Sequence, residues 1–407
     1  MTEENKSIGK FPTGGYFEIP RLRFPEFTGV WENKRLGELL EFKNGINASK
    51  EQYGSGVKFI NVLDILSNDF ITYDNIVGKV NVDELIVEKF SVSYGDILFQ
   101  RSSETREEVG TANVYLDKNK NATFGGFVIR GKKIGEYNPV FFNKLLKTNS
   151  ARENITSKSG GSTRFNVGQE ILSSVNLYFP NLPEQDKIAS FLLFVDERIQ
   201  TQKKIIEQLE TLMKATREKV FSQKLRFKDE YGNYFSDWKT IKLDEICDIK
   251  KGEQLNKEDL TDTGNYPCLN GGMSFSGYTD KFNSDKNTIT ISEGGNSCGF
   301  VSFMKSKFWL GGHCYKIITK RDISTKFLFH LLKFYEKEIM NLRVGSGLPN
   351  IQQKDLKNLQ LIFSNDIEEQ TKIANFLSSI QEKIETEKQI LEKLELQKKF
   401  LLANLFV

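Results

Sequence analysis

The chain has 407 residues, of which 38% are hydrophobic and 27% charged, and it contains 32 Phe and 13 Tyr. This composition supplies two or three globular cores and is not typical of a disordered or collagen-like chain. The 57 Lys and Arg against 54 Asp and Glu give a net charge of only +3. That balance excludes a histone-like polycation, although it permits local basic patches.

No apolar run approaches the ~18 residues needed to cross a bilayer. The first 15 residues carry several charges and no apolar signal core. The four cysteines are scattered through the second half, which favours free thiols over a disulfide framework. We therefore expect a soluble, cytoplasmic protein.

The first half begins with a mixed region. Short β-prone runs, bounded by Gly or Asn, predict strands at Val57–Val62, Asp96–Gln100, Ala112–Leu116, Thr123–Ile129 and Val175–Phe179. Phe141–Lys147 and Asn166–Leu172 are expected to be helical. Asn166, followed three residues later by Gln169, predicts a capping box at the start of the second of these helices.

A long helix is predicted after Pro183, because apolar residues recur there at three, four or seven positions and neither Pro nor Gly interrupts the run. A helix from Gln185 to about Ser222 would measure roughly 57 Å. Its expected apolar stripe consists of Ile188, Phe191, Val195, Ile199, Ile206 and Leu209.

The second half follows the same order. Strands are predicted at Thr288–Ser292, Gly299–Phe303 and Cys314–Ile318, and a helix at Thr325–Tyr335, with Asn350 as the N-cap of a short helix. A second long helix ends the chain. Its expected apolar stripe consists of Ile373, Phe376, Ile380, Ile384, Leu391 and Leu394.

The two halves are copies of one unit. Residues 185–214 and 370–399 are identical at 15 of 30 positions, and Trp31–Leu36 resembles Trp238–Leu243. Gly45 and Gly125 are 80 residues apart, whereas their counterparts Gly252 and Gly311 are 59 apart. The first copy therefore carries about 21 extra residues in this stretch, and whatever the stretch contacts should differ between the copies.

These patterns predict an α+β fold with a pseudo-two-fold internal repeat. Two similar mixed α/β domains are expected to be separated by an antiparallel pair of long coiled-coil helices, because each long apolar stripe needs a partner. In the alternative arrangement, each helix lies on its own domain. The expected parts are a first mixed domain at 1–183, a central helix at 184–225, a second mixed domain at 226–367 and a C-terminal helix at 368–407.

Motifs for catalysis are incomplete. Gly126–Lys133 has the spacing of a P-loop but lacks its final Ser or Thr, and Asn138–Phe141 departs from the methyltransferase NPP(Y/F) motif at Val140. Glu32–Lys34 has the form of a nuclease motif without an upstream acidic ligand. The two histidines lack zinc-site spacing. Alignment of His313 with Phe127 and of His330 with Lys144 predicts a core position and a solvated helix face, respectively.

The starts of both long helices carry one motif, Glu-Gln-x-Lys-Ile-Ala-x-Phe-Leu, at 184–192 and 369–377. With Gly95–Phe99, Trp31–Leu36 and the Asn270–Gly272 turn, the chain resembles the specificity subunit of type I restriction-modification systems over nearly its whole length.

The resemblance implies a non-catalytic chain whose two target-recognition domains read the halves of a bipartite, asymmetric DNA sequence. It also implies that the helix pair docks two modification (methyltransferase) subunits, to which two restriction (nuclease/translocase) subunits add. S-adenosylmethionine, ATP and Mg²⁺ would then belong to those partners, and this chain would hold neither a cofactor nor a metal.

DNA contacts need donors and acceptors for base edges, and cations, amides or helix N-termini for phosphates. Arg101 could bind guanine, and the extra residues of the first copy could carry the identity of its half-site. For each candidate, a solvated loop is the competing interpretation. The candidates are Lys43, Asn44, Asn61, Gln100, Arg101, Ser102, Ser103, Ser162, Thr163, Arg164, Lys250, Lys251, Asn270 and Ser346.

Two other classes of protein remain open. A two-headed coiled-coil adaptor that binds proteins would explain the helices but not the differing insertion on one scaffold. A nuclease–methylase fusion is disfavoured by the incomplete motifs.

Overall fold

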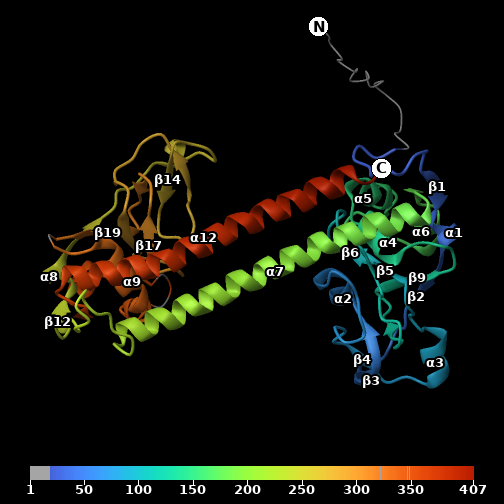
Figure 1. Ribbon diagram of the computed structural model, residues 1–407. Coiled ribbons are helices and arrows are strands. Elements are labelled where there is room, and N and C mark those ends of the chain that lie inside the picture. The colour runs from blue at the N-terminus through green and yellow to red at the C-terminus, as the bar shows by residue number, and fades with distance from the viewer. Residues whose placement is uncertain (1–18, 321, 346, 348) are drawn as a thin grey trace, which may run out of the picture. The chain divides into compact units, whose positions relative to one another are not determined.

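The computed structural model describes residues 19–407 except 321, 346 and 348 (Figure 1). The described chain forms two compact units. The first comprises residues up to Thr201 together with Leu391–Val407, and the second comprises Gln202–Ile390. Each unit therefore contains parts of both long helices. No helix in the described part of the chain is long and apolar enough to cross a membrane.

The first unit is built on a four-stranded antiparallel sheet with the order β2-β9-β5-β7. A three-stranded sheet (β4-β3-β8) and the pairs β1-β11 and β6-β10 complete its strands. Their bounds are β1 Glu32–Arg35, β2 Leu40–Asn44, β3 Tyr53–Ile60, β4 Lys79–Val80, β5 Ile97–Gln100, β6 Ser102–Ser103, β7 Ala112–Val114, β8 Thr123–Phe124, β9 Val128–Lys133, β10 Phe165–Asn166 and β11 Asn176–Phe179.

The second unit repeats this topology. Its four-stranded sheet has the order β13-β19-β16-β17, its three-stranded sheet the order β15-β14-β18, and β12 pairs with β20. Their bounds are β12 Lys239–Lys242, β13 Cys247–Lys251, β14 Tyr266–Leu269, β15 Gly277–Thr279, β16 Thr288–Ser292, β17 Val301–Met304, β18 Trp309–Leu310, β19 Cys314–Thr319 and β20 Gln360–Phe363.

Helices accompany both sets of sheets. In the first unit they are α1 Leu36–Leu39, the 3-10 turn η1 Lys50–Gln52, α2 Val62–Ser67, α3 Glu84–Lys89, α4 Pro139–Leu145, α5 Asn149–Thr156 and α6 Gln169–Ser173. In the second unit they are α8 Leu243–Ile246, the 3-10 turn η2 Lys257–Asp259, α9 Thr325–Phe334, α10 Glu336–Asn341 and α11 Gln353–Lys357. The long helices are α7 Leu182–Phe221 and α12 Ile367–Asn404.

The repeat holds down to individual close contacts. A Cβ at Gly45 would lie 2.1 Å from the carbonyl oxygen of Gly125, and a Cβ at Gly252 would lie 2.3 Å from that of Gly311. Both copies therefore need glycine where one strand ends against the same turn. The predicted α+β fold with an internal repeat is confirmed.

The extra residues of the first copy add helices. α2 and α3 lie between β3 and β5, whereas the matching stretch between β14 and β16 contains strand β15 and no α-helix. The backbone N–H of Asn61 donates to Asp64 Oδ2 at 2.7 Å, and this contact fixes the start of α2.

Within the first unit, the C-terminal end of α12 lies beside the start of α7, and the two helices run in opposite directions (Figure 1). Lys398 Nζ is 2.6 Å from Asp196 Oδ1, and Lys144 of α4 binds the other carboxylate oxygen. Burial alone would raise the pKa of Asp196, but hydrogen bonds from Lys144 and Lys398 hold it below its ordinary value. The carboxylate thus joins both long helices to the first recognition domain.

Within the second unit, the other ends of the helices meet. Gln202 Nε2 donates to the carbonyl oxygen of Glu387 at 3.1 Å, and Lys388 Nζ is 2.6 Å from Glu210 Oε1. Met213 of α7 and Ile384 of α12 belong to one buried cluster, which also includes Phe327 of α9. The predicted antiparallel pairing is therefore seen inside each unit, and each helix also packs on a recognition domain.

Most of the predicted stripe is buried. The buried residues are Ile188, Val195, Ile199, Ile206, Ile373, Ile384 and Leu394, and the half-buried ones are Leu209, Ile380 and Leu391. The two phenylalanines differ from the prediction. Phe191 packs edge-on against Phe24 at 5.6 Å, and Phe376, 40% exposed, packs against Phe227 at 5.6 Å. Phe191 and Phe376 thus contact Phe24 and Phe227, in the segments that precede the two mixed domains.

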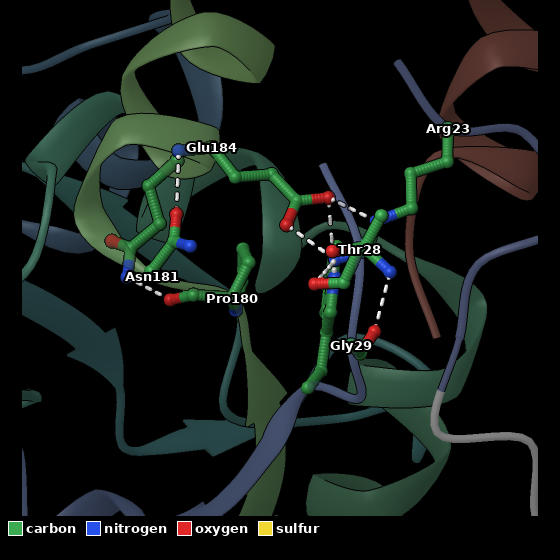
Figure 2. Close-up of polar contacts among 8 residues, drawn as sticks. Arg23, Thr28, Gly29, Pro180, Asn181 and Glu184 are labelled. Atoms are coloured by element: carbon green, nitrogen blue, oxygen red, sulfur yellow. Dashed lines mark hydrogen bonds and ion pairs between the residues drawn. The ribbon is translucent and has the colours of Figure 1, made fainter. Parts of the chain in front are cut away.

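The starts of the long helices are fixed by matching contacts. Asn181 caps α7 by accepting the Glu184 N–H at 3.0 Å, and Arg23 Nε and Nη2 bind the two oxygens of Glu184, each at 2.7 Å (Figure 2). In the second unit, Trp238 Nε1 donates to Glu369 Oε2 at 2.8 Å. Trp31 likewise faces Glu184, at 3.4 Å. In both units, therefore, the tryptophan just before the first β-strand contacts the glutamate at the start of the long helix.

Asn166 and Asn350 do not cap helices, contrary to the prediction. The N-caps are Gly168 for α6 and Gln352 for α11. Asn166 pairs with Gly160 and Ser102, and Asn350 forms bridges with Val344 and Gly294. Both asparagines serve strand-like pairing that closes a loop, and local sequence does not reveal such partners.

Candidate nucleic-acid interface

In the first unit, Arg101 stands where strand β5 ends. Its backbone N–H donates to the carbonyl oxygen of Phe127 at 2.9 Å, and its own carbonyl oxygen accepts the N–H of Val167 at 3.0 Å. The half-buried side chain reaches back, with Nη1 3.4 Å from the carbonyl oxygen of Gly126. The backbone of Arg101 is therefore fixed on both sides at the junction of two turns, and its guanidinium makes one long contact with a main-chain oxygen.

In the second unit, Glu293 follows strand β16. Its N–H donates to the carbonyl oxygen of His313 at 2.8 Å, and its carbonyl oxygen accepts the N–H of Ile351 at 2.8 Å. Glu293 Oε1 is 2.7 Å from Lys251 Nζ and accepts a hydrogen bond from the Tyr315 hydroxyl at 2.9 Å. Burial, reinforced by this carboxylate, raises the pKa of Tyr315, so the phenol remains a donor.

Arg101 and Glu293 thus occupy the same position on two copies of one scaffold, with opposite charge. The last residue of the matching strands β2 and β13 also differs. Asn44 in the first unit corresponds to Lys251 in the second, because both precede the paired glycines. One unit offers a cation beside an amide, and the other offers a carboxylate held by a lysine. Equivalent positions of the two units consequently present different hydrogen-bonding groups.

An open hollow of about 770 Å³ lies next to Arg101 in the first unit. One wall is a closed hairpin, in which the Gly160 N–H donates to the Asn166 carbonyl at 3.1 Å and the Asn166 N–H donates back at 2.9 Å. Gly161 has φ +119°, a value that favours glycine. The hollow is lined by Asn44, Arg101, Gly160, Gly161, Asn166, Val167, Gly168, Gln169, Glu170 and Ile171.

The tip of this hairpin consists of Ser162, Thr163 and Arg164, and all three side chains are exposed. Arg164 Nη2 is 3.9 Å from Glu104 Oε1, but both side chains are mostly exposed, so this ion pair is weak. The three predicted residues therefore lie together beside the hollow and are available to a ligand.

Comparison with known proteins identifies the scaffold. A family model described as the type I restriction modification DNA specificity domain matches residues 29–211 and 235–396. The chain belongs to this family. The two matched segments correspond to the two copies of the repeat, and the family consists of specificity chains rather than catalytic ones.

Individual relatives agree with the family model. A putative type I specificity subunit of Mycoplasma genitalium is 38% identical over 158 residues, which cover 38% of this chain and 41% of that protein. The chain thus spans about two fifths of that relative. The MjaVIII type I restriction enzyme specificity subunit of Methanocaldococcus jannaschii is 25% identical over 418 residues, covering 94% of this chain and 92% of that one.

The fold is also shared with a solved structure. The crystal structure of a type I restriction-modification S subunit from M. genitalium has a TM-score of 0.64 and 21% sequence identity, and covers 96% of this chain and 99% of that one. At this identity the likeness concerns the arrangement of secondary structure alone.

Two predicted DNA contacts of this specificity chain point inward. Gln100 is 5% exposed, and its Nε2 donates to the carbonyl oxygen of Ser102 at 2.9 Å. Ser103 is 7% exposed, and its hydroxyl donates to Glu108 Oε2 at 3.0 Å. Their burial corrects the prediction, because both side chains brace the turn that carries Arg101. Ser102, between them, is half-buried and donates to Asn166 Oδ1.

The predicted lysines differ in exposure, although Lys43 and Lys250 occupy equivalent positions of β2 and β13. Lys43 is half-buried, with Nζ 3.0 Å from the Lys89 carbonyl oxygen and 4.7 Å from the Phe90 ring centre. Burial lowers the pKa of Lys43, and the nearby charges of Arg130 and Lys89 add to the effect. Lys43 is thus already engaged by contacts within the first unit, whereas Lys250 is exposed.

The remaining predicted residues are dispersed. Asn61 is exposed at the start of α2. Asn270 is half-buried, and its Oδ1 accepts the His313 N–H at 3.3 Å. Ser346 lies outside the described residues.

The two histidine predictions are wrong. Phe127 is 68% exposed and His313 is also exposed, so this shared position is a tip rather than a core site. His330 is 1% exposed, and burial, with the positive charges of Arg217 and Lys326, lowers its pKa to about 3. Its counterpart Lys144 is buried as well. Alignment found the equivalences correctly, but it could not tell which face of each element was covered.

The incomplete catalytic motifs have structural roles. Gly126–Lys133 forms a turn and strand β9, and Asn138 Oδ1 caps α4 by accepting the N–H groups of Val140 and Phe141. Glu32–Lys34 lies in β1. Among the described residues, no three His, Cys, Asp or Glu side chains are grouped so that they could hold a metal ion.

Sequence reasoning missed Glu293 and the exposure of Phe127. The repeat contained the signal for Glu293. Ser292 pairs with Cys314 as Gln100 pairs with Val128, so Glu293 is the residue equivalent to Arg101. Counting from the shared strands, rather than from identical residues, would have found it.

Proposed function

We propose that this chain reads DNA sequence for a type I restriction-modification complex, with each unit reading one half of a bipartite, asymmetric target. The observation that carries the proposal is the reversal of charge between Arg101 and Glu293 on equivalent scaffolds of a DNA specificity family. A protein that recognised two identical ligands would not need opposite charges at matched positions.

The two groups suit different bases. Arginine binds the O6 and N7 acceptors of guanine, whereas a carboxylate accepts from the amino group of cytosine. Main-chain contacts hold the backbone of Arg101, and Lys251 and Tyr315 hold the Glu293 carboxylate, so the position of each residue is set before DNA binds. Pre-orientation reduces the entropy lost on binding.

Phosphate contacts would position these readers. Arg164, Ser162 and Thr163 at the hairpin tip are exposed, and so is Lys250. Such contacts supply affinity without sequence information and make binding depend on salt. The net charge of only +3 fits local patches of this kind rather than general attraction to DNA.

The helix pair would dock two modification (methyltransferase) subunits, and two restriction (nuclease/translocase) subunits would join through them. Exposed apolar residues on the helices support this assignment: Phe194, Leu396 and Phe400 are 60–62% exposed. S-adenosylmethionine, ATP and Mg²⁺ would be bound by those partners, with the present chain acting as a non-catalytic scaffold.

An electrophoretic shift with randomised duplexes, with and without a methyltransferase partner, tests the proposal. Selected duplexes should share two short elements separated by an unread spacer. Failure to retain any duplex, combined with stable binding of the protein partner, would instead support a protein-binding adaptor.

A further inference from the structure

The most exposed aromatic side chain near Arg101 belongs to Phe127, which is 68% exposed. It sits in the turn between β8 and β9. The turn is closed by the Val128 N–H, which donates to the Gly125 carbonyl at 2.8 Å, and the Phe127 carbonyl accepts the Arg101 N–H at 2.9 Å. The Gly125 N–H donates to the Ile60 carbonyl at 3.0 Å. The ring is therefore carried by a turn whose backbone is anchored to neighbouring strands.

The underside of the turn is packed. A Cβ at Gly126 would lie 1.9 Å from Asn47 Oδ1, and one at Gly125 would lie 3.0 Å from the Phe59 ring. The two glycines are therefore closely packed against their neighbours, whereas Phe127 at the tip is exposed. Burying a phenylalanine stabilises a protein, so a turn that keeps the Phe127 ring in water forgoes this stabilisation.

Other apolar residues surround the tip. A hollow of about 210 Å³ is lined by Tyr53, Phe59, Asn61, Val62, Leu63, Gly125, Gly126, Phe127 and Val128. Leu63 is 73% exposed and Tyr53 is 48% exposed. Single exposed apolar residues are ordinary, but an exposed cluster of them beside a polar surface marks an interaction site.

We propose that Phe127, flanked by Leu63, is an apolar wedge that enters one base step of the first half-site and partly unstacks it. The inference rests on the proposed function and adds the way in which the first unit deforms its DNA. Arg101 Nη1 lies 3.4 Å from the carbonyl oxygen of Gly126, the residue before Phe127. Docking the guanidinium on a base edge therefore brings the phenyl ring to the neighbouring stack.

This occupant fits the chemistry of the cluster. Proteins that kink DNA insert Phe or Leu between base pairs while nearby cations bind the backbone. The cost of unstacking depends on the step and is lowest at pyrimidine–purine steps. The wedge would thus favour particular base pairs at this step of the DNA, even where no side chain forms a hydrogen bond to them.

The wedge is specific to the first unit. At the matching turn of the second unit, His313 is the exposed residue. Leu63 belongs to α2, within the extra residues that the second copy lacks. We therefore expect distortion in one half of the target only.

The test uses the chain assembled with its methyltransferase subunits, and a duplex carrying the target found by sequencing methylated DNA. 2-Aminopurine is placed at successive positions of the first half-site other than the methylated adenine. Wild-type complex should raise the fluorescence at one step. Phe127→Ala should abolish that rise and weaken binding roughly 5–150-fold, the range for loss of one base–aromatic stack.

Leu85→Ala is the matched control, since Leu85 is 79% exposed in the same unit but lies in α3. It should change neither signal, and both variants should unfold like wild type, as surface substitutions do. The wedge is refuted if wild type binds its target specifically while Phe127→Ala matches it in affinity and fluorescence. It is also refuted if replacing thymine by uracil reproduces the loss without any unstacking, which would indicate contact with a methyl group. Absence of specific binding by wild type would instead refute the proposed function.

Discussion

Lys398, near the end of α12, lies 2.6 Å from Asp196, near the start of α7. The same carboxylate binds Lys144, whose side chain is 3% exposed. The Asp196 carboxylate therefore connects α7, α4 and α12, which are far apart in the sequence. A buried ion pair is not in itself evidence of stability, but removing one partner leaves the other charge uncompensated.

Asp196→Asn should lower the free energy of unfolding of the first unit by about 3 kcal/mol or more, because Lys144 would remain buried without its counter-charge. Urea unfolding at pH 7 measures the change. Glu210→Gln removes the carboxylate of the Glu210–Lys388 pair, whose side chains are 50% and 55% exposed, and should cost less than about 1 kcal/mol. Equal losses from both substitutions would contradict the assigned role of Asp196.

The second unit should lose stability in acid through His330, whose pKa is lowered to about 3 from an ordinary 6.5. Below pH 6.5 His330 is protonated in the unfolded chain, whereas in the folded chain it stays neutral until the pH nears 3. Stability should therefore fall as the pH drops through this window, by up to about 1.4 kcal/mol per pH unit for one proton. His330→Gln should show a shallower fall in urea unfolding between pH 6.5 and 4. Parallel curves for both proteins would show that His330 does not titrate in this way.

Arg164→Ala should weaken binding of all duplexes alike and reduce the salt slope of log affinity by about 1, because an exposed hairpin arginine is suited to a phosphate. Arg101→Ala should instead lower discrimination at one base pair by about 1–3 kcal/mol. Binding titrations at several salt concentrations, on target and on unrelated duplex, separate the two effects. Should Arg101→Ala weaken both duplexes equally, its assignment to a base would be wrong.

Partner docking should depend on the exposed phenylalanines of the helices. Phe194 and Phe400 belong to the first unit, whereas the positions 185 residues away in the repeat are Ser379 and Ala215. Phe194→Asp with Phe400→Asp puts two charges on this exposed apolar face of the first unit and leaves the second unit unchanged. Native mass spectrometry should then show loss of one methyltransferase subunit, with urea unfolding unchanged. Retention of two subunits would place docking elsewhere.

The long helices and the repeat could be predicted because their signals are local or periodic. Apolar spacing identified α7 and α12, and β-prone composition identified β16 at Thr288–Ser292 as observed. Helix capping at Asn166 was predicted wrongly because its partners, Ser102 and Gly160, are brought to it by the fold. Spacing along the chain cannot weigh such competing partners.

The candidate site was predicted in part for the same reason. Arg101 and Asn44 were found from residue type and position, and both line the hollow. Gln100 has equally suitable chemistry, but β5 is buried on both faces, so the Gln100 side chain is covered as well. Glu293 was not predicted, because a carboxylate becomes a candidate DNA contact only once it is known to be equivalent to Arg101.

The measurement that tests the central claim most directly is the methylated DNA motif of cells carrying the wild-type chain, Arg101→Ala or Glu293→Gln with their partner subunits. Sequencing that detects modified adenines reports each motif. The account predicts a bipartite, asymmetric motif for wild type, relaxed in one half by Arg101→Ala and in the other half by Glu293→Gln. A single contiguous motif, or two variants that relax the same half, would contradict it.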